Sequence, residues 1–313
     1  MKRKKYNIAK EFQKWNKLNP PINKFFAPLF QCFLRPLMKM QRSKKDCLVE
    51  RKCVNIDGKK VRFLVYSPRV STTACPCLIY YHGGGYVLPA APYHYRNARK
   101  YASLCGCKVF FPDYPLSPKH KFPTPSKVCF DFYKYILENA EAYGIDKRKI
   151  ALGGDSAGAN IAAIVCMMAT DNNIAPPLAQ MLIYPVINTK TPTPSMLEFD
   201  TTGMCNNKDI EKYGRLYYGK DKDKYERYLS PLNQENLSKF PATYIETAEF
   251  DCLRDEGKLF AEELKKNGVL VTENNTRGTI HGYDIVKKSK IVEQSINKRI
   301  EFLNAQFDKK EKI

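Results

Sequence analysis

The feature that most constrains the fold is an alternation of short apolar runs with amphipathic stretches, which begins near residue 47 and continues almost to the end of the chain. Most of the apolar runs are continuous, a pattern typical of strands that are buried on both faces. Strands that alternate with helices predict an α/β fold with a mostly parallel sheet covered by helices on both sides. The predicted strands span 49–56, 59–67, 77–85, 107–114, 149–154, 180–186, 242–250 and 269–275, and the predicted helices span 93–104, 126–143, 157–170, 255–267 and 288–306.

Composition places the chain among ordinary globular proteins. Its 313 residues are 43% hydrophobic and 27% charged, enough for one large or two ordinary domains with a substantial core. The 11 cysteines stand singly or in C-x-C pairs beside only four histidines, so neither a zinc site nor a disulfide framework is expected. The start of the chain lacks the apolar run and cleavage site of a signal peptide. These features predict free thiols, a cytoplasmic location and no metal.

The formal net charge of +20 is concentrated near the N-terminus. Residues 1–60 contain 17 Lys or Arg and four acidic residues, a net charge of +13. Such an arm attracts polyanions in general, either nucleic acid or an anionic membrane surface. No nucleic-acid-binding motif accompanies it, so no nucleic-acid partner is expected. A solvated basic face is the simpler interpretation of the charge.

The most apolar part of this arm is the segment 25–40. At about half of the ~20 residues that a membrane span requires, it is too short to cross a bilayer. It either packs on the body of the protein, which is the favoured interpretation, or makes a weak contact with a membrane surface beside its basic neighbours. Six of its residues have helix-like spacing: Phe26, Phe30, Phe33, Leu34, Leu37 and Met38.

A serine between two glycines marks the turn from the strand at 149–154 to the helix at 157–170. Gly154, Ser156 and Gly158 form the pattern G-x-S-x-G. A sharp strand-to-helix turn leaves little room for side chains at the flanking positions, and it holds the serine hydroxyl out of the fold. Ser156 is therefore the candidate nucleophile, and Asp155 is expected to support the turn. The motif alone is weak, but its strand and helix context is the one that the chemistry requires.

A serine hydroxyl needs an adjacent base, and His281 is the only histidine that follows Ser156 in the chain. It lies in a loop between the last predicted strand and the last predicted helix. Asp251, at the end of the strand 242–250, is the candidate carboxylate that orients this histidine. Asp255 fits the first turn of the next helix better, and Glu249 lies within the strand as a weaker rival.

Two of the remaining histidines, His94 and His120, are expected in polar surface loops. The third, His82, opens the run HGGG at the end of the third predicted strand. Consecutive glycines let backbone N–H groups approach a developing oxyanion closely.

The expected oxyanion donors are therefore Gly84, Gly85 and Ala157. His82 and Gly83 are expected to support this loop. The chain order of serine, aspartate and histidine is the one expected for nucleophile-elbow sheet enzymes.

Four motifs together carry a family resemblance: YHGGG at 81–85, GDSAG at 154–158, FDCLRDEG at 250–257 and HGY at 281–283. From about residue 45 to 306 the chain resembles the hormone-sensitive-lipase-like branch of the α/β-hydrolase fold, which contains bacterial carboxylesterases and arylacetamide deacetylase. The resemblance implies a nucleophile at Ser156, an acid at Asp251, a base at His281, the oxyanion hole named above, and no cofactor.

The resemblance also implies a division of the chain. The expected parts are an N-terminal cap segment (1–45), the first part of the hydrolase core (46–187), a cap insertion (188–235) and the second part of the core (236–313). Two departures from the family pattern are visible: PLSPK follows FPDY where R-L-A-P-E is usual, and Ala159 stands where a further glycine is common. Neither departure touches the expected chemistry.

The sequence therefore predicts a serine carboxylesterase for small-molecule esters, with short to medium acyl chains. Two alternatives stay open: a membrane-surface lipase, and a relative on the same fold that binds a small ligand without catalysis. A homodimer through the final strand and helix is a further expectation, because these are common pairing surfaces in this family. The pocket size is not readable from residue spacing.

Overall fold

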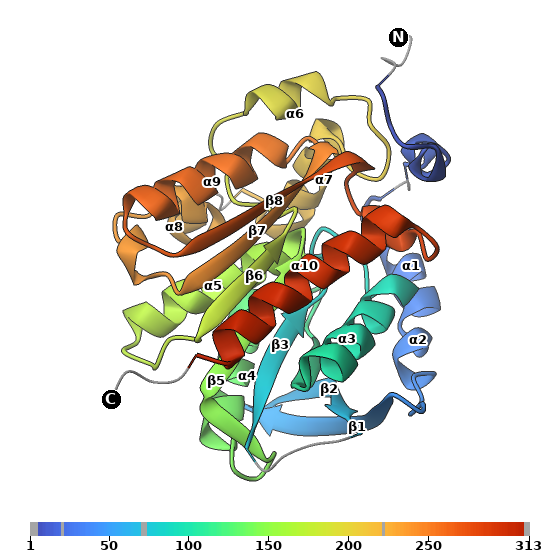
Figure 1. Ribbon diagram of the computed structural model, residues 1–313. Helices are drawn as coiled ribbons and strands as arrows, with labels where there is room; N and C mark the ends of the chain where they lie inside the picture. Colours follow the sequence, from blue (N-terminus) through green and yellow to red (C-terminus); the bar gives the residue numbers. More distant parts are fainter. Residues whose placement is uncertain (1–5, 20–21, 70–73, 221–222, 310–313) are drawn as a thin grey trace.

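The computed structural model describes residues 6–19, 22–69, 74–220 and 223–309, and its centre is an eight-stranded sheet in the order β1-β2-β4-β3-β5-β6-β7-β8 (Figure 1). β2 runs antiparallel to both of its neighbours, and every other neighbouring pair is parallel. This arrangement confirms the predicted α/β class. The strands are β1 (Cys47–Ile56), β2 (Lys59–Pro68), β3 (Cys75–Tyr81), β4 (Lys108–Asp113), β5 (Ile145–Asp155), β6 (Ala179–Ile183), β7 (Ala242–Phe250) and β8 (Val271–Ile280).

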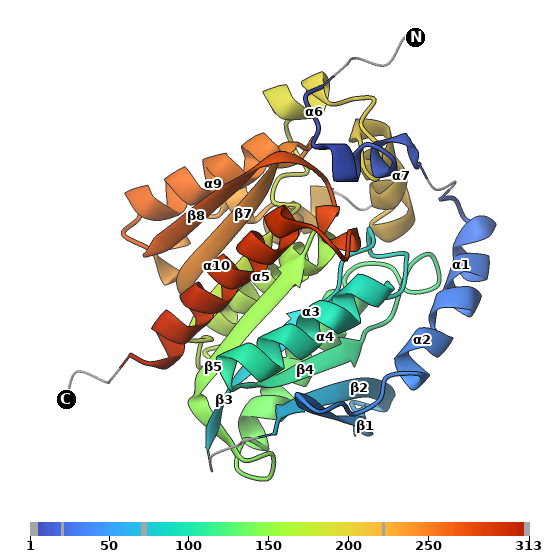
Figure 2. The ribbon, with the colours of Figure 1, turned by 45° about the vertical axis from the view of Figure 1, so that its right-hand side comes forward.

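Helices cover both faces of the sheet. α3 (Pro92–Cys105) and α10 (Lys290–Phe307) pack side by side on one face, which is the near face in Figures 1 and 2. α4 (Thr124–Glu138), α5 (Ala157–Asp171) and α9 (Arg254–Lys266) pack on the other face. The carboxyl ends of the parallel strands lie at one edge of the sheet. The helices cover its two faces and leave that edge free for a ligand site.

The continuous apolar runs follow from this sandwich. Neighbouring residues of a strand point to opposite faces, and here both faces are buried. In β3, Leu78 contacts the α3 and α10 side while Ile79 contacts the side of α4 and α5. In β5, Ala151 packs on the side of α3 and α10, and Leu152 packs on the side of α4 and α5.

The predicted helix 126–143 is wrong at both ends. α4 begins at Thr124, with Pro125 in its first turn, where a fixed φ and a missing N–H cost nothing. It ends at Glu138. The backbone N–H and the side-chain amide of Asn139 both donate to the Tyr135 carbonyl oxygen, at 3.1 and 2.8 Å, and the chain then turns. Gly144, with φ +60°, completes that turn before β5.

Two segments outside the sandwich meet above the carboxyl ends of the strands (Figure 2). The Gly203 N–H donates to Asn16 Oδ1 at 2.8 Å, and the Met204 N–H donates to the Leu18 carbonyl oxygen at 2.7 Å. The N-terminal segment contains η1 (Lys10–Phe12), η2 (Trp15–Lys17), α1 (Phe26–Leu34) and α2 (Pro36–Lys39). The segment after β6 contains α6 (Pro194–Glu198), α7 (Asn207–Tyr217), η3 (Asp223–Tyr225), α8 (Glu226–Leu229), η4 (Pro231–Asn233) and η5 (Leu237–Lys239).

Within the described ranges, none of these helices is both long and apolar enough to span a membrane. One short turn, η6 (Tyr283–Ile285), lies between β8 and α10.

Candidate active site

Ser156 lies at the turn between β5 and α5 in a strained backbone conformation, with φ +54° and ψ −121°. Its N–H donates to the Ile183 carbonyl oxygen at 2.8 Å, which ties the turn to β6. A Cβ added at Gly154 would lie 2.4 Å from the Gly158 carbonyl carbon, and one added at Gly158 would lie 2.1 Å from the Tyr81 carbonyl oxygen. Contacts this short exclude any side chain, so both glycines of the motif are steric requirements.

His281 and Asp251 meet Ser156 at neighbouring strand ends. Nε2 of His281 is 2.9 Å from Oγ of Ser156, and Nδ1 of His281 is 2.7 Å from Oδ2 of Asp251. Asp251 follows β7 and is fully buried, and its second oxygen accepts from the Leu253 N–H at 3.0 Å. The ring of Tyr184 packs edge-on against His281, with 4.9 Å between centroids. With a proton on Nδ1, the histidine donates to Asp251 and accepts from the serine hydroxyl.

The two rival carboxylates have other partners. Asp255 accepts from the Ser195 N–H at 2.8 Å and pairs with Arg254 Nε at 2.8 Å. Glu249 accepts from the Gly278 N–H at 2.6 Å. Neither is recorded in contact with His281, so among the described residues Asp251 is the carboxylate that the geometry brings to the imidazole.

The pKa of His281 is set by two opposing effects. Burial lowers the pKa, but the Asp251 carboxylate outweighs it and raises the pKa from 6.5 to about 9. The site therefore favours the imidazolium, which is the form that a base acquires after it takes a proton from a nucleophile.

Gly84 and Gly85 of the HGGG loop line the same cavity as Ser156 and His281. Gly84 and Gly85 have φ values of +114° and +60°, which favour glycine. The Gly84 carbonyl oxygen accepts from the N–H groups of Val87 and Leu88, at 3.0 and 2.8 Å, which closes the loop. Within the part of the chain that the structure describes, no acceptor pairs with the N–H of Gly84 or Gly85. Ala157, the first residue of α5, is fully buried directly after the serine.

Asp155 connects the serine turn to the HGGG loop. Its carboxylate accepts from the Tyr80 hydroxyl at 2.9 Å, from the Gly83 N–H at 3.1 Å and from the Tyr93 hydroxyl at 3.2 Å. Burial raises the pKa of Asp155, but His94 and the Tyr80 hydroxyl outweigh it and lower the pKa to about 2. A Cβ at Gly83 would lie 2.4 Å from Asp155 Oδ2, so this position also requires glycine.

His94 is not in a surface loop, and this prediction is wrong. It lies in the first turn of α3, is 2% exposed, and its Nε2 is 3.0 Å from Asp155 Oδ2. Its Nδ1 accepts from the Ala91 N–H at 2.8 Å. The available signal was its place in the predicted helix 93–104, because a helix that covers a sheet turns one side inward. His120 lies in a loop as expected and is half-buried.

His82 is buried under the HGGG loop. Its ring stacks on Tyr114 with 4.5 Å between centroids, and the Tyr114 hydroxyl donates to the His82 carbonyl oxygen at 2.7 Å. Burial lowers the pKa of His82 to about 3, so the ring is neutral and does not compete with His281 as a base.

Glu256 is a buried carboxyl near the site that the sequence did not single out. Its Oε1 accepts from the N–H groups of Ile187 and Asn188, at 2.6 and 3.3 Å, and so holds the chain that leaves β6. Burial raises the pKa of Glu256 to about 8, against the effect of these two donors. A carboxylate in the first turn of a helix is common, so the position of Glu256 in α9 gave no sign that it binds the chain after β6.

A cavity of about 300 Å³ opens beside Ser156, and its walls are mainly apolar. α1 contributes Phe30 and Leu34, and α7 contributes Ile210 and Tyr213. The Tyr213 ring lies against Gly85, where an added Cβ would be 2.3 Å from it. The N-terminal segment and the segment after β6 therefore both contribute walls to the same pocket.

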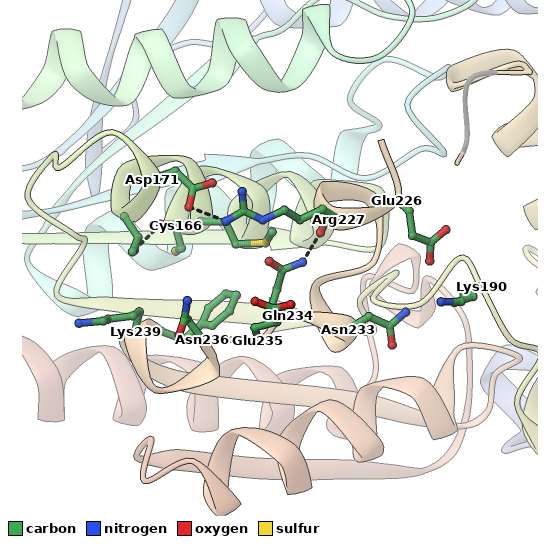
Figure 3. A pocket seen from close by; sticks show the side chains of 13 residues that line it. Cys166, Asp171, Lys190, Glu226, Arg227, Asn233, Gln234, Glu235, Asn236 and Lys239 are labelled. Atoms are coloured by element: carbon green, nitrogen blue, oxygen red, sulfur yellow. Dashed lines mark hydrogen bonds and ion pairs between the residues drawn. The ribbon is translucent and has the colours of Figure 1, made fainter. Parts of the chain in front are cut away.

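Figure 3 shows a second cavity, of about 620 Å³, between the end of α5 and the segment 226–240. Its walls mix polar and apolar side chains, and Arg227 pairs with Asp171 at 2.7 Å. The lining contains no histidine and no serine. The smaller cavity at Ser156 is therefore the candidate active site.

The comparisons with known proteins agree with this geometry. A family model described as the alpha/beta hydrolase fold matches residues 78–285. An arylesterase of Saccharolobus solfataricus is 31% identical over 231 residues, which cover 74% of this chain and 75% of that protein. A carboxylesterase (NlhH) of Mycobacterium tuberculosis is 32% identical over 255 residues, or 80% of each chain.

Among solved structures, an esterase of Pyrobaculum calidifontis superimposes with a TM-score of 0.83 at 33% identity and covers 92% of this chain and 95% of that one. The sheet order, the four motifs at its strand ends and these similarities lead to one conclusion: the chain belongs to the hormone-sensitive-lipase-like branch of the α/β-hydrolase family.

Proposed function

We propose that the protein is a serine carboxylesterase in which Ser156 is the nucleophile, His281 the base and Asp251 the orienting acid. The observation that carries the proposal is the continuous chain of hydrogen bonds, 2.9 Å from Ser156 Oγ to His281 Nε2 and 2.7 Å from His281 Nδ1 to Asp251. The esterase relatives support the same reaction class.

Acylation begins when His281 Nε2 takes the hydroxyl proton as Ser156 Oγ bonds to the ester carbonyl carbon. The carbonyl oxygen becomes an oxyanion, and the N–H groups of Gly84, Gly85 and Ala157 are proposed to bind it. His281 then gives its proton to the departing alkoxide as the ester C–O bond breaks. The alcohol leaves, and the acyl group stays on Ser156.

Deacylation repeats these steps with water. His281 removes a proton from the water as its oxygen bonds to the acyl carbon, and it returns the proton to Ser156 Oγ as the acyl–serine bond breaks. The carboxylic acid is released and the serine is restored. Asp251 stabilises the imidazolium in both halves of the cycle.

The proposed substrates carry short to medium acyl chains. A cavity of about 300 Å³ is at the small end of ligand pockets, and its apolar walls suit an acyl group rather than a charged one. The proposed cap consists of residues 1–45 and 188–235, because α1 and α7 from these segments wall the cavity.

A series of chromogenic acyl esters of increasing chain length tests the proposal. We expect hydrolysis of the shorter esters, loss of hydrolysis in Ser156→Ala, and near wild-type activity in the matched control Ser103→Ala on α3. Covalent labelling by a fluorophosphonate distinguishes the enzyme from a ligand-binding relative, because labelling needs an activated serine. A folded wild-type protein that neither hydrolyses any ester nor reacts with the probe contradicts the proposal.

Two further proposals concern the location of the protein and its assembly. A cytoplasmic location is supported by the 11 cysteines, all of which are free. A homodimer through β8 and α10 is supported by the position of β8 at the edge of the sheet, where its outer side has no strand partner among the described residues.

A further inference from the structure

The helix α1 is apolar on both of its sides. Toward the protein, Ala27 is fully buried and Phe30 and Leu34 line the cavity, while the Gln31 amide donates to the carbonyl oxygens of Val87 and Ser117 at 2.9 and 2.7 Å. These contacts seat the helix firmly. A surface helix normally presents polar residues on its other side, so the composition of the outer face needs an explanation.

The outer face carries large apolar side chains in contiguous positions. Phe25 is 76% exposed and Phe33 is 72% exposed, and Phe26 and Leu29 lie between them, also exposed. Positions three and four apart on a helix are neighbours, so these residues form one patch rather than scattered contacts. We call Phe25, Phe26, Leu29 and Phe33 the outer patch. Single exposed hydrophobic residues are ordinary, but a contiguous patch marks an interaction surface.

Cations surround the outer patch. Residues 22–45 contain six Lys or Arg and no acidic residue: Lys24, Arg35, Lys39, Arg42, Lys44 and Lys45. All six are exposed, and none forms an ion pair with any carboxylate in the described ranges. Figure 2 shows α1 and α2 at the right-hand edge of the molecule, with their outer sides away from the sheet. The basic residues are therefore available to an external anion.

A second copy of the chain does not fit this surface. In a two-fold dimer the same patch meets itself, so the six cations would face six more. The net charge of +20 adds to this repulsion. An anionic lipid surface supplies both missing complements, an apolar layer for the aromatic rings and negative headgroups for the cations.

We infer that the outer patch and its basic border dock the protein on an anionic lipid surface. The helix then lies in the plane of the interface, with its inner side still against the cavity at Ser156. This inference does not depend on the proposed esterase activity, because it concerns binding alone. The described ranges contain no helix that is long and apolar enough to cross a bilayer.

Sedimentation with lipid vesicles tests the inference. The full-length protein is mixed with phosphatidylcholine vesicles, either pure or containing phosphatidylserine. We expect binding to the anionic vesicles and much weaker binding to the neutral ones, and we expect added salt to weaken the binding by screening. Wild-type protein that fails to sediment with the anionic vesicles overturns the inference.

Paired variants distinguish binding through the outer patch from non-specific adsorption to vesicles. Phe25→Ser with Phe33→Ser should lower the partition coefficient about tenfold or more, whereas the matched pair Leu197→Ser with Leu270→Ser, also exposed, should leave it unchanged. Lys39→Gln with Arg42→Gln should reduce binding to anionic vesicles only, unlike the control pair Lys147→Gln with Lys266→Gln. Equal losses in test and control pairs overturn the inference.

Two further measurements remove competing explanations. Hydrolysis of a soluble ester by the Phe25 and Phe33 variant should match the wild type, because neither side chain lines the cavity, and this shows that the variant is folded. Analytical ultracentrifugation of the wild type and the same variant detects self-association. A dimer that disappears in the variant, without loss of vesicle binding, overturns the inference and assigns the patch to a second copy.

Discussion

Nε2 of His281 lies 2.9 Å from Oγ of Ser156, although 125 residues separate the two in the chain. The contact exists because parallel strands end at one edge of the sheet, so the loops after β5 and β8 open toward the same space. Asp251 enters from the loop after β7, which lies between them.

Replacement of Asp251 by asparagine should lower kcat by a factor of about 10³–10⁴, because an amide cannot stabilise the imidazolium or hold the required tautomer. The variant should fold, since the change is isosteric. Asp255→Asn is the matched control, and it should keep kcat within severalfold, since Asp255 binds Ser195 and Arg254 instead. Steady-state kinetics on one chromogenic ester measures both. A larger loss in Asp255→Asn would reverse the assignment of the acid.

The pH profile should report the raised pKa of His281. A general base must be neutral, so kcat/KM should fall as the pH drops through the pKa of about 9, giving an alkaline optimum. Asp251→Asn should move this limb to lower pH because it removes the carboxylate that raises the pKa. A wild-type limb below pH 6.5, measured as kcat/KM across the pH range, would contradict the assignment.

His281 also contributes to the free energy of unfolding. This contribution decreases as the pH rises, whereas kcat/KM increases. The raised pKa means that folding favours the protonated histidine. This stabilisation is fully present below the unfolded pKa of about 6.5 and is lost as the pH rises through the folded pKa of about 9. Urea unfolding of the wild type and of Asp251→Asn at several pH values measures it. The difference between the two proteins should shrink toward high pH.

A methyl group at Gly158 should destabilise the fold by about 3 kcal/mol or more, since its Cβ would lie 2.1 Å from the Tyr81 carbonyl oxygen at the end of β3. Gly106→Ala is the matched control: its φ is +59°, but nothing lies within 4 Å of the added Cβ. That change should cost about 1–2 kcal/mol from backbone strain alone. Urea unfolding midpoints give the comparison. Gly158 lies in α5 without a positive φ, so a loss in Gly158→Ala no larger than that in Gly106→Ala would contradict the predicted collision.

Arg299 of α10 is fully buried between Glu246 and Asp284, at 2.5 and 2.8 Å. Arg299→Met should destabilise the protein by about 3–5 kcal/mol, because it leaves two buried carboxylates without their counter-charge. The exposed pair of Arg215 with Glu211 is the control, and Arg215→Met should produce no measurable change. Thermal unfolding checks both variants.

The sequence located all eight strands and the candidate residues that follow them, although three predicted strand ends (85, 186 and 275) differ from the observed ends at Tyr81, Ile183 and Ile280. Continuous apolar runs locate the buried strands, and the glycines around Ser156 reflect a steric need that local geometry alone explains. The residues placed at successive strand ends therefore came together. The cap could not be derived in the same way, because the position of Tyr213 against Gly85 depends on packing between distant segments.

The sequence also did not reveal the buried polar residues that support the site. His94 was expected in a surface loop and Glu256 was not singled out. Only the tertiary fold shows that His94 contacts Asp155 and that Glu256 contacts the chain after β6. The end of α4 at Glu138 was missed because the turn that follows it, closed by Gly144 at φ +60°, depends on local backbone geometry that apolar periodicity does not report.

The hydrogen bonds from Gly203 to Asn16 and from Met204 to Leu18 have a consequence for protein engineering. A Cβ at Gly203 would lie 2.3 Å from the Asn16 backbone, so the two segments fit each other closely. Chimeras that exchange only residues 188–235 with a relative would separate these partners, and a useful graft has to carry the matching N-terminal residues as well. The substrate range of such a chimera then depends on both segments being transferred together.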